Sequence, residues 1–101
     1  PRILRIGFLE LHRTARTAMW MEKDLDLEPQ QFALLLCIGE ASPGTASYHQ
    51  IWREAWPEFQ GIDPQKQTIQ TNLSRLRRKI DKAGAAITIN SVDGGYSLEV
   101  W

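Results

Sequence analysis

A long amphipathic stripe near the end of the chain limits most strongly what it can fold into. Ile69, Leu73, Leu76 and Ile80 recur at i, i+4, i+7 and i+11, the spacing that places side chains on one side of a helix. A helix with a single apolar face must bury that face against other elements. Its opposite face is polar and basic, so that face has to stay in water or meet a polar partner.

We expect this helix to run from Asp63 to Lys82. Asp63 would be the N-cap, and Pro64 would occupy the first helical position, where a proline sacrifices no hydrogen bond. Lys79 and Lys82 suit the negative, C-terminal end of the helix dipole, and Gly84 is a natural stop.

A largely buried helix is expected between Pro29 and the Ser42-Pro43-Gly44 turn, because residues 32–38 are apolar nearly all round. Cys37 lies within this run, where a core residue is a better interpretation than a nucleophile. It is the one cysteine in the sequence, which excludes an internal disulfide.

A second helix begins with a clear local signal. Ser47 and Gln50 form a capping box, in which each side chain can satisfy a backbone N–H at the helix start. An apolar stripe follows, and Pro57 ends the helix, so that residues 57–62 are expected to form a loop. The stripe consists of Tyr48, Ile51, Trp52, Ala55 and Trp56.

Alternating apolar residues predict small antiparallel sheets at both ends of the chain. Four short N-terminal strands, the first two meeting near Gly7, fall within residues 2–11, 16–21 and 23–27. Near the C-terminus, strands at 87–91 and 96–100 flank Val92-Asp93-Gly94-Gly95, a strong hairpin signal. The predicted fold class is α+β, with residues 1–101 forming one domain.

The formal net charge is zero, but the charges are segregated. Between Asp63 and Lys82, six basic side chains outweigh two acidic ones, a local charge of +4, and acidic residues gather between Glu22 and Glu28. A solvated helix face is the simpler interpretation of such charge. Glutamate, which commonly fills solubilising faces, is absent from this helix, and that favours a binding role.

The face opposite the apolar stripe carries the groups that recognise DNA. Amides can read adenine edges and arginines can read guanine, while hydroxyls and lysines hold phosphates. Most of these amides and hydroxyls, on Gln67, Thr68, Thr71 and Asn72, lie in the N-terminal half, the half that enters the major groove in helix-turn-helix proteins. The candidate DNA-binding residues are Gln67, Thr68, Thr71, Asn72, Ser74, Arg75, Arg77, Arg78 and Lys82.

Four stretches, in chain order, resemble the OmpR-type winged helix-turn-helix family, the effector domain of many bacterial response regulators. Residues 27–35 look like the start of its first helix, and residues 47–56 are similar to its second. Residues 69–80 look like its recognition helix, and Gly95-Tyr96-Ser97-Leu98 matches the Gly-Tyr-x-Leu that closes its wing. The resemblance covers essentially the whole chain.

This resemblance implies a four-stranded N-terminal sheet, three helices and a C-terminal β-hairpin wing. It implies a cytoplasmic, bacterial transcriptional regulator that binds double-stranded DNA sequence-specifically, with the third helix in the major groove and the wing in the minor groove. It further implies RNA polymerase contact through loop 57–62. An intermediate interpretation is a homodimer on DNA, in which DNA is held only after dimerisation driven by a receiver or other domain. The start at Pro1 suggests a fragment of a longer regulator. Family base and phosphate contacts would fall on Gln67, Thr68, Thr71, Asn72, Arg75 and Arg77.

One departure leaves a second interpretation open. The family wing usually carries an arginine before its glycine, whereas this wing carries Asp93, which would repel phosphates. The alternative is a winged-helix protein-interaction module that has weakened or lost DNA binding.

We expect no enzyme, cofactor, metal or membrane contact: there is no phosphate-cradling glycine loop, no long apolar run, and no carboxylate or thiol at ligand-like spacing from His12 or His49.

Overall fold

The computed structural model of the chain describes residues 2–101 and begins with a four-stranded antiparallel sheet, as the sequence predicted. The strands pair in chain order, each with the next. Leu9, Leu11, Ala18 and Trp20 point inward from the two middle strands and are buried. The strands are β1 (Ile3–Ile6), β2 (Leu9–His12), β3 (Thr17–Trp20) and β4 (Lys23–Asp24).

Helix α1 (Pro29–Ala41) lies at the centre of the molecule and contacts α2, α3 and both sheets. Phe32, Leu35 and Ile38 are fully buried, which confirms the expected buried helix. Gly39 lets the N-terminal sheet approach closely, because a Cβ there would lie 3.1 Å from Leu11 Cδ1. The helix ends at the Ser42-Pro43-Gly44 turn, as predicted.

Helix α2 (Tyr48–Ala55) begins with the predicted capping box. Gln50 N–H donates to Ser47 Oγ at 3.1 Å, and Ser47 N–H donates to the Gln50 side-chain oxygen at 2.8 Å. Pro57 follows the end of the helix, as predicted. The expected loop at 57–62 was only partly right, because Pro57–Phe59 forms a turn of 3-10 helix, η1.

Helix α3 runs from Lys66 to Ala83, so the predicted start at Asp63 was wrong. The N-cap position is Gln65, whose backbone is extended and whose carbonyl accepts the first helical bond, from Ile69 N–H. Neither Asp63 nor Pro64 belongs to the helix. Gly84, in the left-handed conformation, ends it as expected.

Tertiary hydrogen bonds explain the late start of α3. The indole N–H of Trp52 donates to the carbonyls of Phe59 and Ile62, both at 3.1 Å, and the Gln60 amide donates to the carbonyls of Trp52 and Trp56. These bonds hold the α2–α3 loop in its own path. The local capping preference of Asp63 therefore does not set where α3 begins.

The second sheet contains the predicted C-terminal hairpin and one strand that the sequence did not reveal. β6 (Ile87–Val92) and β7 (Gly95–Val100) are joined by the two-residue turn Asp93-Gly94, and Gly94 has a positive φ of 84°. β5 (Thr45–Ser47), between α1 and α2, pairs antiparallel with β7. The strand order is β5-β7-β6, so β6 is an outer strand.

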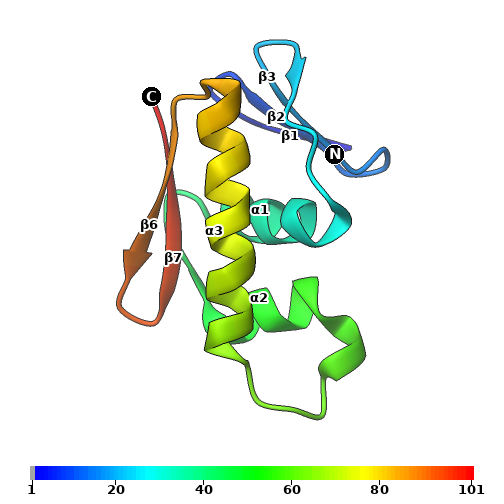
Figure 1. Ribbon diagram of the computed structural model, residues 1–101, viewed down its shortest axis with the longest axis vertical. Helices are drawn as coiled ribbons and strands as arrows, with labels where there is room; N and C mark the ends of the chain where they lie inside the picture. The colour runs from blue at the N-terminus through cyan, green and yellow to red at the C-terminus, as the bar shows by residue number, and fades with distance from the viewer. Residues whose placement is uncertain (1) are drawn as a thin grey trace.

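In Figure 1, α3 lies beside the β6–β7 hairpin, with the N-terminal sheet near one end and the α2–α3 loop near the other. Ile69, Leu73, Leu76 and Ile80 are buried, which confirms the predicted inner stripe of α3. Among residues 2–101, no helix is both long and apolar enough to cross a membrane.

Substitution of Gly95 by alanine should destabilise the fold by about 1–3 kcal/mol, because the added Cβ would collide with the backbone carbonyl of Ala46 in β5. Urea denaturation measures this change. Gly61→Ala is the matched control: a Cβ there meets nothing within 4 Å, so its effect should stay within about 0.5 kcal/mol. Equal stability of the two variants would contradict the close β5–β7 packing.

Candidate nucleic-acid interface

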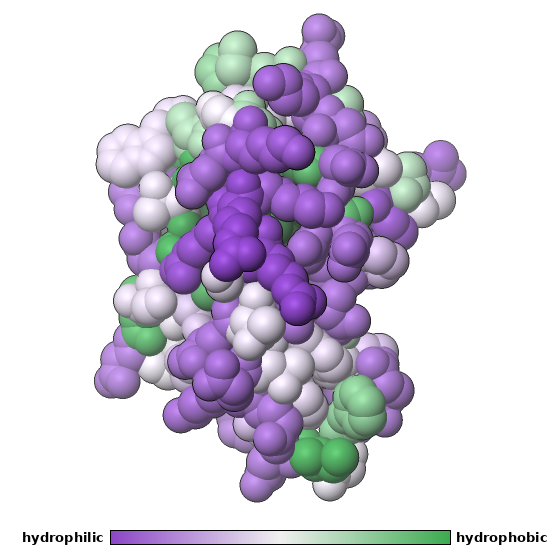
Figure 2. All heavy atoms as spheres, viewed as in Figure 1, coloured by the Kyte–Doolittle hydropathy of each residue, from purple (hydrophilic) through white to green (hydrophobic). Residues whose placement is uncertain are grey.

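The outer face of α3 is a continuous polar surface. Gln67, Thr71, Ser74, Arg75 and Arg78 are all exposed, as the helical period predicted. Figure 2 shows hydrophilic side chains gathered over α3 on the side facing the viewer. These five residues line one shallow hollow together with Gln70, which the sequence analysis did not single out.

Thr68 and Asn72 lie on the flank of this face and are half-buried. The Asn72 amide donates to the Thr68 carbonyl at 2.9 Å, and the Thr71 hydroxyl donates to the Gln67 carbonyl, also at 2.9 Å. Each bond joins a side chain to the backbone one turn earlier and holds it against the helix. The hydroxyl and amide oxygens retain acceptor capacity for a ligand.

Two of the predicted basic residues are placed differently from the rest. Arg77 is half-buried, and its guanidinium donates a hydrogen bond to the carbonyl of Ile89 in β6. Lys82 is exposed at the C-terminal end of α3 and faces a groove shared with the N-terminal sheet. The structure therefore brings Arg75 and Arg78 together with the amide and hydroxyl half of the helix, but not Lys82.

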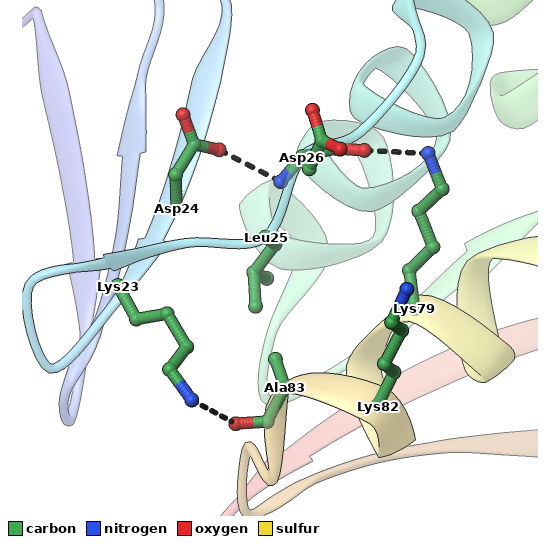
Figure 3. Close-up of a pocket in the computed structure, with 7 residues that line it drawn as sticks. All are labelled: Lys23, Asp24, Leu25, Asp26, Lys79, Lys82 and Ala83. Atoms are coloured by element: carbon green, nitrogen blue, oxygen red, sulfur yellow. Dashed lines mark hydrogen bonds between the residues drawn. The ribbon is translucent and has the colours of Figure 1, made fainter.

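The groove beside Lys82 joins α3 to the segment around β4 (Figure 3). Lys79 Nζ donates to the Asp26 carbonyl at 2.5 Å, and Lys23 Nζ donates to the Ala83 carbonyl at 3.4 Å. The second bond satisfies a carbonyl in the last turn of α3, where cations are favourable. Asp24 and Asp26 also line the groove. The bonds of Lys23 and Lys79 attach the N-terminal segment to α3.

The wing turn is exposed and lies near the start of α3. Tyr48 N–H donates to the Gly94 carbonyl at 3.2 Å, which ties the turn to the start of α2. Lys66 Nζ lies 4.9 Å from the centroid of the Tyr48 ring, and Lys66 and Gly94 line the same hollow. A lysine from α3 thus stands close to the turn that carries Asp93.

The α2–α3 loop presents apolar side chains to solvent. Phe59 and Ile62 are 45% and 51% exposed, and both line a hollow with Trp52 and Trp56. The two tryptophan rings stack with centroids 5.1 Å apart and are themselves buried, which confirms their prediction as packing residues. Hydrophobic atoms are visible over this loop at the bottom of Figure 2.

Two other sequence expectations concern titratable groups. The expectation that His12 has no nearby carboxylate was wrong, because Glu10 Oε1 lies 3.2 Å from His12 Nε2; the two residues alternate on β2 and share a face. Within residues 2–101, no group of three or more His, Cys, Asp or Glu side chains is placed to hold a metal ion. Cys37 is a buried core residue, as predicted.

Three helices, an antiparallel sheet before them and a β-hairpin after them define a winged helix-turn-helix domain with a polar outer face on its third helix. The family model described as "Transcriptional regulatory protein, C terminal" matches residues 22–98, more than half of the chain. The chain belongs to this family, which is one of transcriptional regulators rather than enzymes.

The similarity of the chain to individual proteins supports this family assignment. The transcriptional regulatory protein SrrA of Staphylococcus aureus is 28% identical over 102 residues, covering 97% of this chain and 41% of SrrA. The chain thus spans about two-fifths of the length of the curated relatives it matches. The DNA-binding domain of CpxR from E. coli superposes with a TM-score of 0.79, at 20% identity over 99% of this chain and 98% of that domain.

A DNA-bound structure also shares the fold. The DNA-binding domain of RstA from Klebsiella pneumoniae, solved in complex with the RstA box, has a TM-score of 0.73 at 18% identity and covers 96% of each chain. At this identity the likeness shows the winged-helix fold.

Burial of Cys37 raises the pKa of its thiol from 9.0 to about 11, and nearby Glu54 and Glu40 act in the same direction. At pH 8 its thiolate fraction should be about a hundredfold below that of an exposed thiol, so a disulfide reagent should modify it very slowly until urea unfolds the chain. Because the folded thiol keeps its proton to higher pH, stability should fall as pH rises from 9 toward 11. Rapid modification of the native protein would contradict this burial.

Proposed function

We propose that this chain binds double-stranded DNA sequence-specifically as the DNA-binding part of a transcriptional regulator. The observation that carries the proposal is the exposed outer face of α3, where amides and hydroxyls precede two exposed arginines. A helix of this kind, held by a buried inner stripe, can enter the major groove with its N-terminal half. Family membership and the DNA-bound structure of the RstA domain support this use of the face.

The residues of α3 divide by chemistry. Gln67, Thr68 and Asn72 are proposed to contact base edges, with Gln70 added because it lines the same hollow as Gln67. The remaining proposed contacts are to phosphates or guanine edges, and they come from Thr71, Ser74, Arg75 and Arg78. Lys82 would reach only phosphates at the edge of the interface, because it lies beside the N-terminal sheet.

The wing would approach the neighbouring minor groove with its exposed turn. Asp93 is unfavourable there, but Lys66, which lines a hollow with Gly94, supplies a positive charge close by. We propose that the protein acts in the bacterial cytoplasm, where its target DNA is, and that two copies bind together on DNA.

Replacing both Arg75 and Arg78 by alanine should weaken DNA binding and reduce the slope of log K against log salt by about 1.8, roughly 0.9 for each phosphate that is no longer neutralised. The duplex for this measurement is selected by the wild-type chain from a random pool. Arg2→Ala with Arg5→Ala is the control, because it removes the same charge from exposed residues outside α3. An unchanged salt slope in the α3 variant would reject the assignment of this face.

The same selection decides between DNA binding and the protein-interaction alternative. An enriched motif supports sequence-specific recognition, and a palindrome or a direct repeat within it supports binding by two copies. Failure to retain any duplex at low salt would favour the protein-interaction module instead.

We further propose that the α2–α3 loop contacts RNA polymerase. The support is its two exposed apolar residues, Phe59 and Ile62, on a backbone that the Trp52 indole holds in place. The loop lies at one end of α3, so it would remain accessible beside bound DNA (Figure 1).

Phe59→Ser with Ile62→Ser should leave duplex affinity within about twofold and should remove activation of a promoter that carries the selected site, because the substitutions remove an apolar surface and leave the outer face of α3 intact. In vitro transcription with purified polymerase measures this. Parallel loss of DNA affinity, or full activation by the variant, would contradict the assignment.

A further inference from the structure

Arg77 stands apart from the other arginines of α3 because its guanidinium is turned toward the wing. Arg75 and Arg78 are exposed, whereas Arg77 is half-buried and donates a hydrogen bond to the Ile89 carbonyl. The bond joins α3 to the strand that leads into the wing turn, 12 residues further along the chain.

The Ile89 carbonyl is a group that the sheet itself leaves without a strand partner. Val92 and Gly95 flank a two-residue turn, so they form a hydrogen-bonded pair. Hydrogen-bonded and non-hydrogen-bonded pairs alternate along an antiparallel ladder, which makes the Ile89–Leu98 pair non-hydrogen-bonded. Since β6 is the outer strand of β5-β7-β6 within residues 2–101, the Ile89 carbonyl points away from the sheet.

A second observation places the positive charge of Arg77 beside the wing sheet. Burial raises the pKa of Tyr96 in β7, and the neighbouring Tyr48 hydroxyl adds to the increase, while the charge of Arg77 acts to lower it. Arg77 therefore acts electrostatically on one wing strand and bonds to the other.

We propose that Arg77 is a positioning residue, which sets the wing relative to the recognition helix, and that it is not one of the phosphate contacts. Its hydrogen bond caps an edge-strand carbonyl and fixes β6 against the flank of α3. The turn at Asp93-Gly94 directly follows the end of β6 at Val92, so the angle of β6 sets where the turn meets the minor groove. This inference rests on the proposed DNA binding.

Three matched variants test the inference on the selected duplex: Arg77→Met, Arg75→Met and Arg78→Met. Each removes one positive charge from α3 and keeps an unbranched side chain. Arg77→Met should weaken binding roughly five- to tenfold at every salt concentration, with the salt slope unchanged. Arg75→Met and Arg78→Met should each reduce the slope by about 0.9. A slope reduced by about 0.9 in Arg77→Met, or an unchanged affinity, would overturn the proposal.

Hydroxyl-radical footprinting separates positioning from a general loss of stability. Arg77→Met should lose protection only on the side of the site where the wing lies and should keep protection over the major-groove segment. Uniform weakening of the whole footprint would contradict a positioning role.

A measurement without DNA distinguishes failure of this inference from failure of the proposed function. In the free protein, amide hydrogen exchange of β6 and β7 should be faster in Arg77→Met than in the wild type, with α1 unchanged. Arg75→Met should leave the wing amides unchanged. If the wild-type chain retained no duplex, the proposed DNA binding would be rejected, but the exchange experiment would still decide the role of Arg77. Equal exchange of the wing amides in all variants would overturn the positioning role of Arg77.

Discussion

Burial of most of the surface of α1 is the constraint on which the rest of the structure depends. Phe32, Leu34, Leu35 and Ile38 are fully buried on a helix that contacts the N-terminal sheet, α2, α3, β5 and β7. Each such side chain contributes about 1.5–3 kcal/mol relative to exposure, so this one helix organises much of the hydrophobic stabilisation. The inner stripe of α3 packs against it, which leaves the outer face in solvent.

The same packing explains how a neutral chain presents a basic surface. The apolar stripe of α3 is buried inside, and four of its basic side chains point in three different directions. Lys79 turns toward the segment after β4, Arg77 toward the wing, and Arg75 and Arg78 toward solvent. The bonds of Lys79 and Arg77 hold parts of the domain together, whereas Arg75 and Arg78 are exposed and can meet a ligand. The local charge counted from the sequence therefore overstates the charge available to DNA.

Features set by neighbours in the chain were predictable from the sequence. The Ser47–Gln50 capping box, the inner stripe of α3 and the turn at Asp93-Gly94 each depend on a few adjacent residues. Features set by distant contacts were not predictable. β5 is three residues long and exists because it pairs with β7, and the start of α3 depends on the Trp52 indole.

The residues of the candidate site also divide into those that the sequence predicts and those whose place depends on distant contacts. Helical periodicity placed Gln67, Thr71, Ser74, Arg75, Arg78 and Lys82 on one face, because that requires only a rotation of about 100° per residue. The structure brings these residues together in one hollow except Lys82, which lines the groove beside the N-terminal sheet. Helical periodicity does not predict the hydrogen bond from Arg77 to β6. It also did not indicate Gln70, which follows Ile69 of the apolar stripe in the sequence but lines the outer hollow.

The most direct measurement of the central claim is an NMR titration of the chain with its selected duplex. The largest amide shift changes and the intermolecular contacts should fall on α3 between Gln67 and Arg78, with smaller changes at the wing turn and none on the N-terminal sheet. Changes confined to the N-terminal sheet or to the α2–α3 loop, with α3 unaffected, would contradict it.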